Sequence, residues 1–383
     1  MNNNVKYQIC TRCVMDTTDP DIVFDKNGYC NHCIKAIDWL KRPPYCLPLI
    51  DKEKALKELI QRIKKSGKRK KYDCIIGLSG GVDSSYVAYL VKNWGLRPLA
   101  IHVDNGWDSE KSVRNIENIC RTLDIDLYTN VLDWNEFRDL QMAFLKASTP
   151  DSDIPADNAI FETLYRVASK YRIKYILTGY NTSSESILAK AWSQGYFDKK
   201  YIKGVYRKFG KKRKLKNIPI LSQYQVYYYQ LIKRIKSINT LDYVIYDKEE
   251  TKNFLERELK WQDYGRKHGE STFTRIFQEF ILPRKFGFDK RKAHYSSLIA
   301  AGQLSRDEAI ELLKEPLYAN DMDAVNDISF FCDKFGITKD EFEKIMALPI
   351  KSINDYPNDY KTLSYKLVNI SIKLAKRFLK RNK

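Results

Sequence analysis

Between residues 73 and 178 the chain alternates short apolar runs with longer stretches in which apolar residues recur every three or four positions. The short runs are typical of buried strands, and the longer stretches of helices with one apolar face. Strands are predicted at residues 73–79, 97–103, 126–132 and 174–178, and helices at residues 83–94, 109–123, 134–147 and 158–171. This alternation predicts an α/β fold, a doubly wound parallel sheet that binds ligands beyond the carboxyl ends of its strands.

The first 72 residues have a different pattern. Residues 1–45 are rich in turn-forming residues, carry four cysteines and end at Pro43-Pro44, which indicates a small module held together by something other than an apolar core. Residues 46–72 contain apolar residues at helical spacing. We therefore expect an N-terminal module followed by a linking helix.

The sheet domain is expected to cover residues 73–250, with one more strand at Leu241–Tyr246. Inside it, residues 198–217 carry ten positive charges opposed only by Asp198, and we interpret this stretch as a mobile basic loop. Weak helical periodicity continues to the end of the chain. Residues 251–383 are therefore expected to form a helical region that contacts substrate or partner.

The overall composition is that of a globular protein, with 43% hydrophobic and 30% charged residues. No apolar run approaches the length of a membrane span, and the first residues lack the apolar core of a secretory signal. We expect a cytoplasmic protein without membrane insertion. The net charge of +19 suggests an anionic partner, such as nucleic acid, a nucleotide-sugar or an acidic protein surface, although an A/T-rich coding bias would also enrich lysine.

Four cysteines in the first module have the spacing of metal ligands. Cys10 and Cys13 form one Cys-x2-Cys pair, and Cys30 and Cys33 form a second pair after sixteen intervening residues. Two such pairs can complete a tetrahedral site for structural Zn²⁺. A redox or iron–sulfur site is the alternative. His32 lies between two of these cysteines and is expected to support the site or face solvent rather than bind the metal.

One predicted junction between strand and helix has the composition of an anion site. Ser79, Gly80 and Gly81 follow the first strand, and Asp83 and Ser84 begin the helix. Glycines let the backbone approach a ligand closely, and a helix N-terminus offers N–H groups to phosphate. Asp83 can cap the helix or help hold Mg²⁺ on the phosphates. The spacing is not that of a Walker A loop, and a plain glycine turn is the alternative.

The hexapeptide Ser-Gly-Gly-Val-Asp-Ser resembles the pyrophosphate loop (PP-loop) of the N-type ATP pyrophosphatases, the superfamily of asparagine synthetase, GMP synthetase, NAD synthetase and tRNA-thiolating enzymes. The resemblance implies cleavage of ATP to AMP and pyrophosphate, with adenylation of an oxygen that a nucleophile then displaces. It also implies that Val103 and Asp104 lie beside the adenosine, that Gly179 closes the ATP site, and that Asn181 contacts the phosphates or the reaction centre. Ordinary turn residues are the alternative at these positions.

Nearly the whole chain resembles the N-acetyl sugar amidotransferases, the acetamidino-forming enzymes of bacterial lipopolysaccharide and nonulosonic acid biosynthesis. The resemblance is carried by residues 10–20, by the loop and by residues 261–309, from "WQDYGRKHGE" to "LSRDEA". It implies that ATP converts the acetamido group of a sugar to an acetamidino group through an O-adenylyl imidate, with AMP and pyrophosphate released. ATP, Mg²⁺ and structural Zn²⁺ are the expected cofactors. The chain has no visible Cys/His glutaminase arrangement, so a glutaminase with a cyclase-like companion is the expected source of ammonia.

Within that last stretch, Lys267, His268 and Glu270 are candidates for catalysis, because His268 or Glu270 could remove protons from incoming ammonia. Lys285 and Arg291 are candidates for binding the phosphates or carboxylate of the substrate. Surface charges and a helix cap are the alternative.

Two rival functions remain open. A tRNA-modifying enzyme of the thiolation type would need sulfur-carrying cysteines near the ATP site, and the remaining cysteines are isolated, namely Cys46, Cys74, Cys120 and Cys332. We interpret them as small buried hydrophobic residues. A zinc-ribbon protein that binds nucleic acid, with a regulatory or inactive ATP loop, is the second rival. We favour the sugar amidotransferase, for which nucleic acid is not an expected partner.

Overall fold

The computed structural model describes residues 6–211, 214–265, 269–318, 320–363, 365, 368 and 370–372. Five parallel strands of this part form one sheet, in the order β3-β2-β1-β4-β5. The strands are β1 (Cys74–Gly77), β2 (Pro98–Asp104), β3 (Asp126–Val131), β4 (Tyr175–Thr178) and β5 (Lys236–Asn239). The chain builds outward from β1 to β3 and then returns to the other side of β1. The space between the ends of β1 and β4 is therefore the switch point at which such sheets bind ligands.

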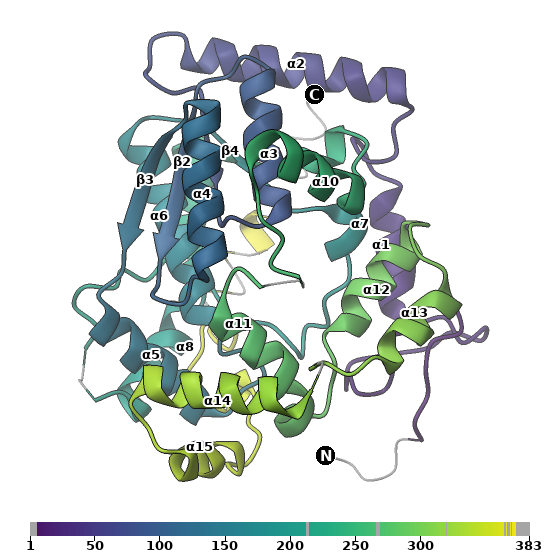
Figure 1. The fold of residues 1–383 in the computed structure, drawn as a ribbon, viewed down its shortest axis with the longest axis vertical. Coiled ribbons are helices and arrows are strands. Elements are labelled where there is room, and N and C mark those ends of the chain that lie inside the picture. Colours follow the sequence, from purple (N-terminus) through teal and green to yellow (C-terminus); the bar gives the residue numbers. More distant parts are fainter. Residues whose placement is uncertain are drawn as a thin grey trace.

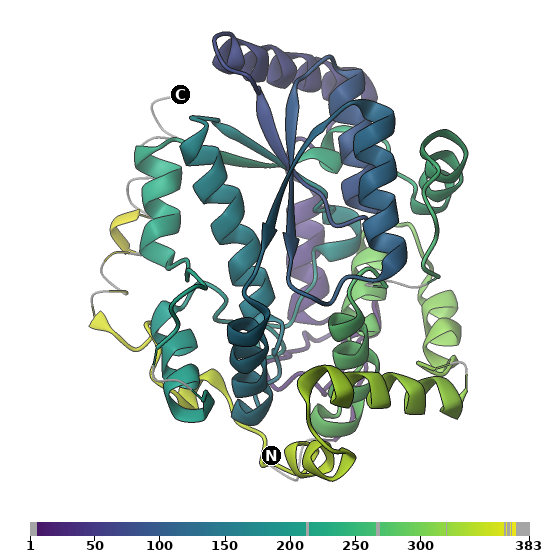
Figure 2. The ribbon, with the colours of Figure 1, turned by 60° about the vertical axis from the view of Figure 1, so that its left-hand side comes forward.

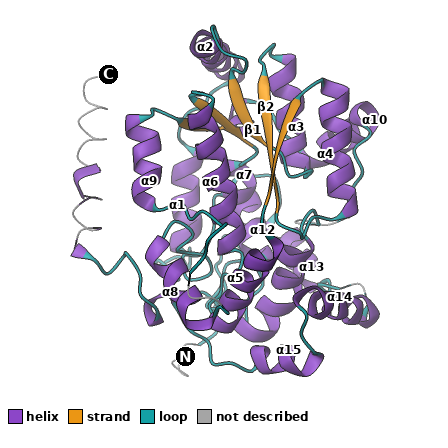
Figure 3. Ribbon diagram, turned by 90° about the vertical axis from the view of Figure 1, so that its left-hand side faces the viewer, coloured by secondary structure: helices purple, strands orange, loops and turns teal. Residues whose placement is uncertain are grey.

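Helices cover both faces of this sheet, as Figure 3 shows with the strands nearly edge-on. One face carries α3 (Val82–Asn93), α4 (Glu110–Leu123) and α10 (Lys248–Leu259). The other carries α6 (Ile154–Lys170), with α9 (Gln223–Tyr227) beside it. The central strands are apolar on both faces, because Ile75 and Ile76 point to opposite faces and both are fully buried. The doubly wound α/β fold predicted from the sequence is confirmed.

A second, helical layer lies beyond the carboxyl edge of the sheet (Figures 1 and 2). Its helices are α5 (Trp134–Ala147), α8 (Lys199–Phe209), α11 (Thr272–Ile276), α14 (Asp321–Phe335) and α15 (Lys339–Met346), with the π-helical segment η3 (Phe277–Phe286). Trp107 lies at its centre, with its ring 5.2–5.9 Å from those of Phe273, Phe331 and Phe335. The C-terminal region is thus helical, as predicted, and shares its core with the loops that follow the strands.

The N-terminal residues pack against this helical layer. Helix α1 (Asn31–Leu40) contacts α12 (Arg291–Ala300), which also contacts α7 (Thr182–Glu185) and α13 (Arg306–Lys314). The linking helix α2 (Leu49–Gly67) lies where the sequence predicts a helix. The short segments η1 (Tyr228–Ile232), η2 (Thr240–Tyr243) and η4 (Ile353–Asp355) complete the assignment.

Two sequence predictions are wrong in this part of the chain. Most of the basic stretch 198–217 is not a loop but helix α8, whose apolar face (Tyr201, Ile202, Val205 and Tyr206) is buried while its lysines face outward. The last strand is Lys236–Asn239 rather than 241–246, because a polar edge strand lacks an apolar run, whereas Leu241 is buried in a 3₁₀ turn. The charge of the first segment and the hydrophobicity of the second misled the interpretation, although Tyr201, Val205 and Tyr206 follow a helical spacing.

The helices of the described residues differ from membrane-spanning helices. None of their helices combines the length and the apolar composition that a membrane crossing requires.

Candidate active site

The loop between β1 and α3 is held in a compact turn by its own serines. The N–H of Gly81 donates to Ser79 Oγ at 3.3 Å, and Ser84 Oγ donates to the carbonyl oxygen of Gly81 at 3.1 Å. The two serine hydroxyls lie 3.2 Å apart. These contacts place the first N–H groups of α3, which have no acceptor within the helix, at the carboxyl end of β1.

Gly80 is required by its surroundings as well as by its backbone angle. Its φ is +77°, and a Cβ atom there would lie 2.4 Å from the carbonyl oxygen of Ser112 on α4. The carbonyl of Gly80 accepts hydrogen bonds from Trp261 Nε1 at 2.8 Å and from Asn115 Nδ2 at 3.2 Å. The loop is thus held from both the sheet domain and the segment that follows α10.

A cavity of about 270 Å³ opens at this loop. Its lining comprises Ser79, Gly81, Val82, Asp83, Ser84, Gly179, Tyr180, Glu185, Lys248, Tyr264 and Glu270. Gly179 follows β4, and a Cβ on it would approach the N–H of Ser84 to 2.9 Å. The cavity therefore occupies the switch point between β1 and β4, with carboxylates, an ammonium and backbone N–H groups around it.

Two tyrosines contact the loop directly. Tyr246 donates a hydrogen bond to the carboxylate of Asp83, and Tyr264 Oη accepts one from the N–H of Val82 at 3.4 Å. Burial, followed by the charge of Asp83, raises the pKa of Tyr246. Burial, followed by the charge of Glu270, raises the pKa of Tyr264. Both hydroxyls therefore stay protonated and available as donors.

The sequence-predicted residues of the loop lie together, and the structure adds Glu270 to them. The carbonyl of Glu270 accepts from the N–H of Ser109 at 2.9 Å, which anchors it beside α4. Lys267 and His268 lie outside the described residues. The catalytic role of Glu270 stays a prediction, now with a position in the cavity wall.

The residues expected beside the adenosine occupy the end of β2. Val103 is buried, and Asp104 Oδ1 accepts from the N–H of Gly106 at 2.9 Å. Asn181 is buried and caps α7, because its Oδ1 accepts from Ser183 N at 3.0 Å. None of the three belongs to the described lining of the cavity, so their ATP contacts stay predictions.

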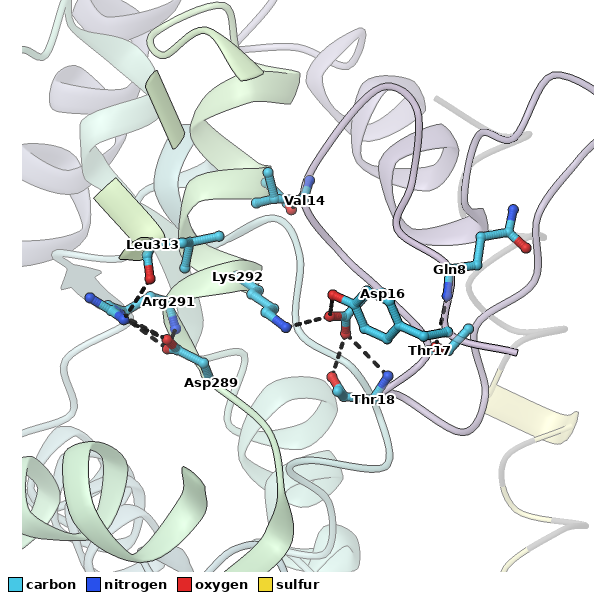
Figure 4. Close-up of polar contacts among 11 residues, drawn as sticks. Gln8, Val14, Asp16, Thr17, Thr18, Asp289, Arg291, Lys292 and Leu313 are labelled. Atoms are coloured by element: carbon cyan, nitrogen blue, oxygen red, sulfur yellow. Dashed lines mark hydrogen bonds and ion pairs between the residues drawn. The ribbon is translucent and has the colours of Figure 1, made fainter. Parts of the chain in front are cut away.

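The side chains of Lys285 and Arg291 are both engaged in hydrogen bonds within the protein. Lys285 Nζ donates to the carbonyls of Ile345, Met346 and Leu348, each at 2.8 Å, and so ends α15. Burial lowers the pKa of Lys285. Arg291 pairs with Asp289 at 2.8 Å and donates to carbonyls at the end of α13, among them that of Leu313 (Figure 4). These contacts favour positioning roles over the predicted phosphate binding.

Sequence reasoning missed Tyr180, Glu185, Tyr246, Lys248 and Tyr264. They reach the cavity from positions after β4 and from both ends of α10, without a shared motif. Only Tyr246 lay in a segment with an apolar pattern, residues 241–246, and that segment was predicted to be a strand. Their discovery required the fold.

The four cysteines of the N-terminal module converge as predicted. All four are fully buried, and their sulfur atoms lie within 4.8 Å of one another. Cys10 Sγ and Cys33 Sγ are 3.8 Å apart, and Cys13 Sγ and Cys30 Sγ are 3.6 Å apart. Four thiolates at zinc–sulfur distances of about 2.3 Å form a tetrahedron with edges of about 3.8 Å. The cluster could therefore hold one metal ion, with His32 bound to Asp19 at 2.5 Å rather than to the cluster.

This module is fastened to the C-terminal region (Figure 4). Arg306 Nε lies 3.2 Å from the carbonyl oxygens of both Cys10 and Cys13. Lys292 forms an ion pair with the fully buried Asp16, whose pKa is raised by burial but lowered more by Lys292 and Thr18. The metal-ligand turns are thus fixed by residues almost 300 positions away in the chain.

Two family models match the chain. Residues 72–200 match the tRNA methyl transferase HUP domain, and residues 270–369 match the model described as LPS biosynthesis protein WbpG-like, C-terminal domain. The second match begins at Glu270, in the wall of the cavity. The PP-loop domain and a WbpG-like domain therefore meet at the candidate active site.

The curated relatives match a smaller part of this chain than the two family models together. The tRNA-specific 2-thiouridylase MnmA 2 of Fusobacterium nucleatum is 31% identical over 118 residues, covering 29% of this chain and 34% of the relative. The tRNA-specific 2-thiouridylase MnmA of Chlamydia pneumoniae is 34% identical over 122 residues, covering 28% and 33%. The chain thus spans about a third of the length of the curated relatives it matches.

Similar solved structures are distant. The U34-tRNA thiolase NcsA of Methanococcus maripaludis with its [4Fe-4S] cluster has a TM-score of 0.34 at 16% identity, covering 81% of this chain and 90% of that chain. The NH3-dependent NAD synthetase of Campylobacter jejuni has a TM-score of 0.27 at 19% identity, covering 35% and 58%. Scores this low carry no conclusion about activity.

Proposed function

The chain is a WbpG-like PP-loop protein, and from this premise we propose that it is an ATP-dependent amidotransferase that converts the N-acetyl group of a bacterial surface-polysaccharide sugar precursor to an acetamidino group. One observation carries the proposal. Glu270, the first residue of the WbpG-like match, lies in the same cavity as the Ser79–Ser84 loop. The WbpG-like match therefore begins in the wall of the cavity that we propose to be the ATP site.

The proposed reaction follows from the chemistry of an amide. Its carbonyl is a poor electrophile, so the amide oxygen first attacks the α-phosphorus of ATP, forming an O-adenylyl imidate and releasing pyrophosphate. Ammonia then adds to the imidate carbon, and the C–O bond breaks to release AMP, which keeps the former amide oxygen. One proton leaves the added nitrogen as the amidine forms. Catalysis would come mainly from positioning and from charge around the phosphates.

The residues of the cavity suit these steps. The N–H groups at the start of α3 and the ammonium of Lys248 would bind phosphate oxygens. The carboxylate of Asp83 is of the ligand type that Mg²⁺ prefers, and Mg²⁺ would offset the charge of the phosphates. Glu270 would accept a proton from ammonium, with Lys267 and His268 as further candidates from the sequence.

Two accessory roles complete the proposal. The four-cysteine cluster would hold structural Zn²⁺, since its short sulfur–sulfur distances suit a single tetrahedral ion and leave no position for substrate. Ammonia would come from a partner glutaminase with a cyclase-like companion.

Thiolation of tRNA is the second candidate, because the curated relatives are thiouridylases. The described lining of the cavity contains no cysteine. Burial raises the pKa of Cys74, of Cys120 to about 11, and of Cys332, which disfavours the reactive thiolate at neutral pH. Cys46 is exposed, contrary to the interpretation of the isolated cysteines as buried, and it does not line the cavity. These observations favour the amidotransferase.

The decisive experiment is turnover with a defined set of acceptors. The protein is incubated with ATP, Mg²⁺, ammonium and free or nucleotide-linked N-acetylated sugars, and AMP, pyrophosphate and sugar products are measured by chromatography and mass spectrometry. We expect AMP and pyrophosphate in equal amounts, with one sugar oxygen replaced by NH. A parallel reaction with tRNA and a sulfur donor serves as the rival arm. AMP formation that requires tRNA and gives no altered sugar would refute the proposal.

A further inference from the structure

A larger cavity, of about 390 Å³, lies outside the ATP site. We call it the interdomain cavity, because its walls come from three parts of the chain. Its lining comprises Thr18, Pro20 and Asp21 from the N-terminal module, Thr149–Asp151, Ile154, Ala191–Gln194 and Tyr201 from the α/β domain and its insertions, and Phe286, Phe288 and Ile350–Asp355 from the C-terminal region. Its volume is within the range of small-molecule sites.

The interdomain cavity and the ATP cavity are neighbours. Asp153, next to the lining residues 149–151, has its Oδ1 atom 3.1 Å from Thr274 Oγ1, which in turn lies 3.1 Å from Ser271 Oγ. Ser271 directly follows Glu270 of the ATP cavity. The segment after β4 also connects the two, since Glu185 lines one cavity and Ala191 lines the other. The walls of the two cavities are thus connected by these side-chain contacts and by the segment after β4.

The lining combines stacked rings with hydrogen-bonding groups. Trp192 and Phe288 stack at 4.4 Å with their planes 5° apart. The indole N–H of Trp192 is buried and has no acceptor among the described residues, and the half-buried Gln194 adds an amide to the lining. Buried donors without partners are costly and indicate a ligand that supplies an acceptor. Apolar rings beside such groups suit a pyranose, which has C–H faces and a rim of hydroxyls.

The charges of the lining indicate which part of an acceptor fits. Asp21 and Asp355 contribute exposed carboxylates and Lys351 an exposed ammonium, while burial raises the pKa of the Asp151 carboxyl and Lys290 opposes that shift. Such a lining disfavours phosphate and carboxylate groups. It favours an uncharged ring and an acetamido group, which becomes positively charged once it is converted to an amidine.

We propose that the interdomain cavity is the acceptor site and holds the acetamido-bearing sugar ring against the ATP cavity, with acidic groups of the substrate kept outside it. This inference rests on the proposed function and adds the position and the residues of its second substrate. It also assigns a role to the WbpG-like domain, which supplies the wall around Phe286 and Phe288 and the wall at residues 350–355.

The test is direct binding of N-acetyl-D-glucosamine to the full chain, measured by saturation-transfer NMR without ATP. Ala191→Trp should fill the cavity and weaken binding at least tenfold, and Gln194→Met should weaken it three- to tenfold by removing the amide. Val113→Trp and Gln61→Met introduce the same two side chains at exposed positions on α4 and α2, and both variants should bind as the unaltered protein does. In turnover, both cavity variants should raise the Michaelis constant for the sugar and leave that for ATP unchanged.

Three results would overturn the inference: no transfer to the sugar, binding that both cavity variants retain, or displacement of the sugar by a non-hydrolysable ATP analogue. These results are distinct from failure of the proposed function. If both variants convert the sugar as well as the unaltered protein does, the proposed acceptor site is wrong but the proposed function stands. If the sugar binds in the cavity but neither AMP nor an amidine forms, the proposed function is wrong but the proposed binding site stands.

Discussion

The ATP loop and the interdomain cavity are built in opposite ways. The loop occupies six consecutive positions, Ser79 to Ser84, and its serines hold the turn by hydrogen bonds within that stretch, although distant side chains, above all that of Trp261, also bond to it. The interdomain cavity needs segments that begin at Thr18 and end at Asp355, and no two of its walls are contiguous. A site of the first kind depends on single residues, whereas a site of the second kind depends on how whole segments pack.

The largest effect is expected within the loop itself. Asp83→Ala removes the carboxylate that Tyr246 holds in the cavity, and AMP release should fall by at least about a hundredfold, the usual cost of removing one preorganised electrostatic group. The measurement is kcat/KM for ATP. Asp51→Ala, an exposed aspartate in the first turn of α2, is the matched control and should retain activity. Equal activity of the two variants would remove Asp83 from the machinery.

The packing between segments is tested at Lys292. Lys292→Met leaves the buried carboxylate of Asp16 without its ammonium, which should lower the free energy of unfolding by about 3 kcal/mol. Urea denaturation measures the change. Lys314→Met breaks an exposed pair with Glu311 and should cost no more than about 0.5 kcal/mol. Similar losses in both variants would mean that the module is not fastened through Asp16.

A third pair of variants separates the cost of backbone strain at Gly80 from the cost of a steric clash with Ser112. Gly80→Ala combines a positive φ with a Cβ placed 2.4 Å from Ser112 O, whereas Gly302→Ala has a φ of +73° and nothing within 4 Å. The control should lose about 1 kcal/mol of stability from strain alone. Gly80→Ala should lose about 2 kcal/mol more and bind ATP poorly, as measured by denaturation and calorimetry. Equal losses would show that the loop tolerates the contact.

The last effect is a pH dependence at the start of α6. Burial, and then the charges of Asp151 and Asp153, raise the pKa of Asp157 to about 8, while Lys290 opposes them. The unfolded chain loses this proton near pH 4, so the folded state loses stability as pH rises from about 4 to 8, by at most about 1.4 kcal/mol per pH unit. Asp157→Asn should therefore raise the melting temperature at pH 8 and leave it nearly unchanged at pH 4. Asp51→Asn is the exposed control, and a parallel shift at both pH values would contradict the assignment.

The sequence predicted most of the sheet because its central strands are buried on both faces. Ile75, Ile76 and their neighbours form runs that no surface segment would carry. The sequence did not predict β5, because the edge strand Lys-Ser-Ile-Asn has no apolar run. It also did not predict α8, because the positive charges of that segment suggested a loop, although Tyr201, Val205 and Tyr206 mark a buried helical face. Helix α6 begins at Ile154, four residues earlier than predicted, because Pro155 is tolerated in a first helical turn.

The candidate site divides in the same way. The loop and the cysteine cluster are local patterns, so their positions followed from spacing. Lys248, Tyr246 and Tyr264 reach the ATP cavity through the packing of α10 on α3 and α4, which no local pattern encodes. The substrate-binding roles of Lys285 and Arg291 stay predictions, and the sequence did not reveal that backbone carbonyls already accept hydrogen bonds from both side chains.

The fastening of the cysteine turns to α12 and α13 has a consequence for biosynthesis. Val14 bonds to Ser296, 282 positions later, and Arg306 is still further along. At translation rates of about 5–20 residues per second, the N-terminal turns wait roughly 15–60 s on the ribosome before their docking surface exists. During that interval a bound metal ion would be the main force that keeps the four thiols together and out of reach of oxidants. Metal supply during synthesis, rather than afterwards, should then decide how much of the newly made chain reaches its folded state.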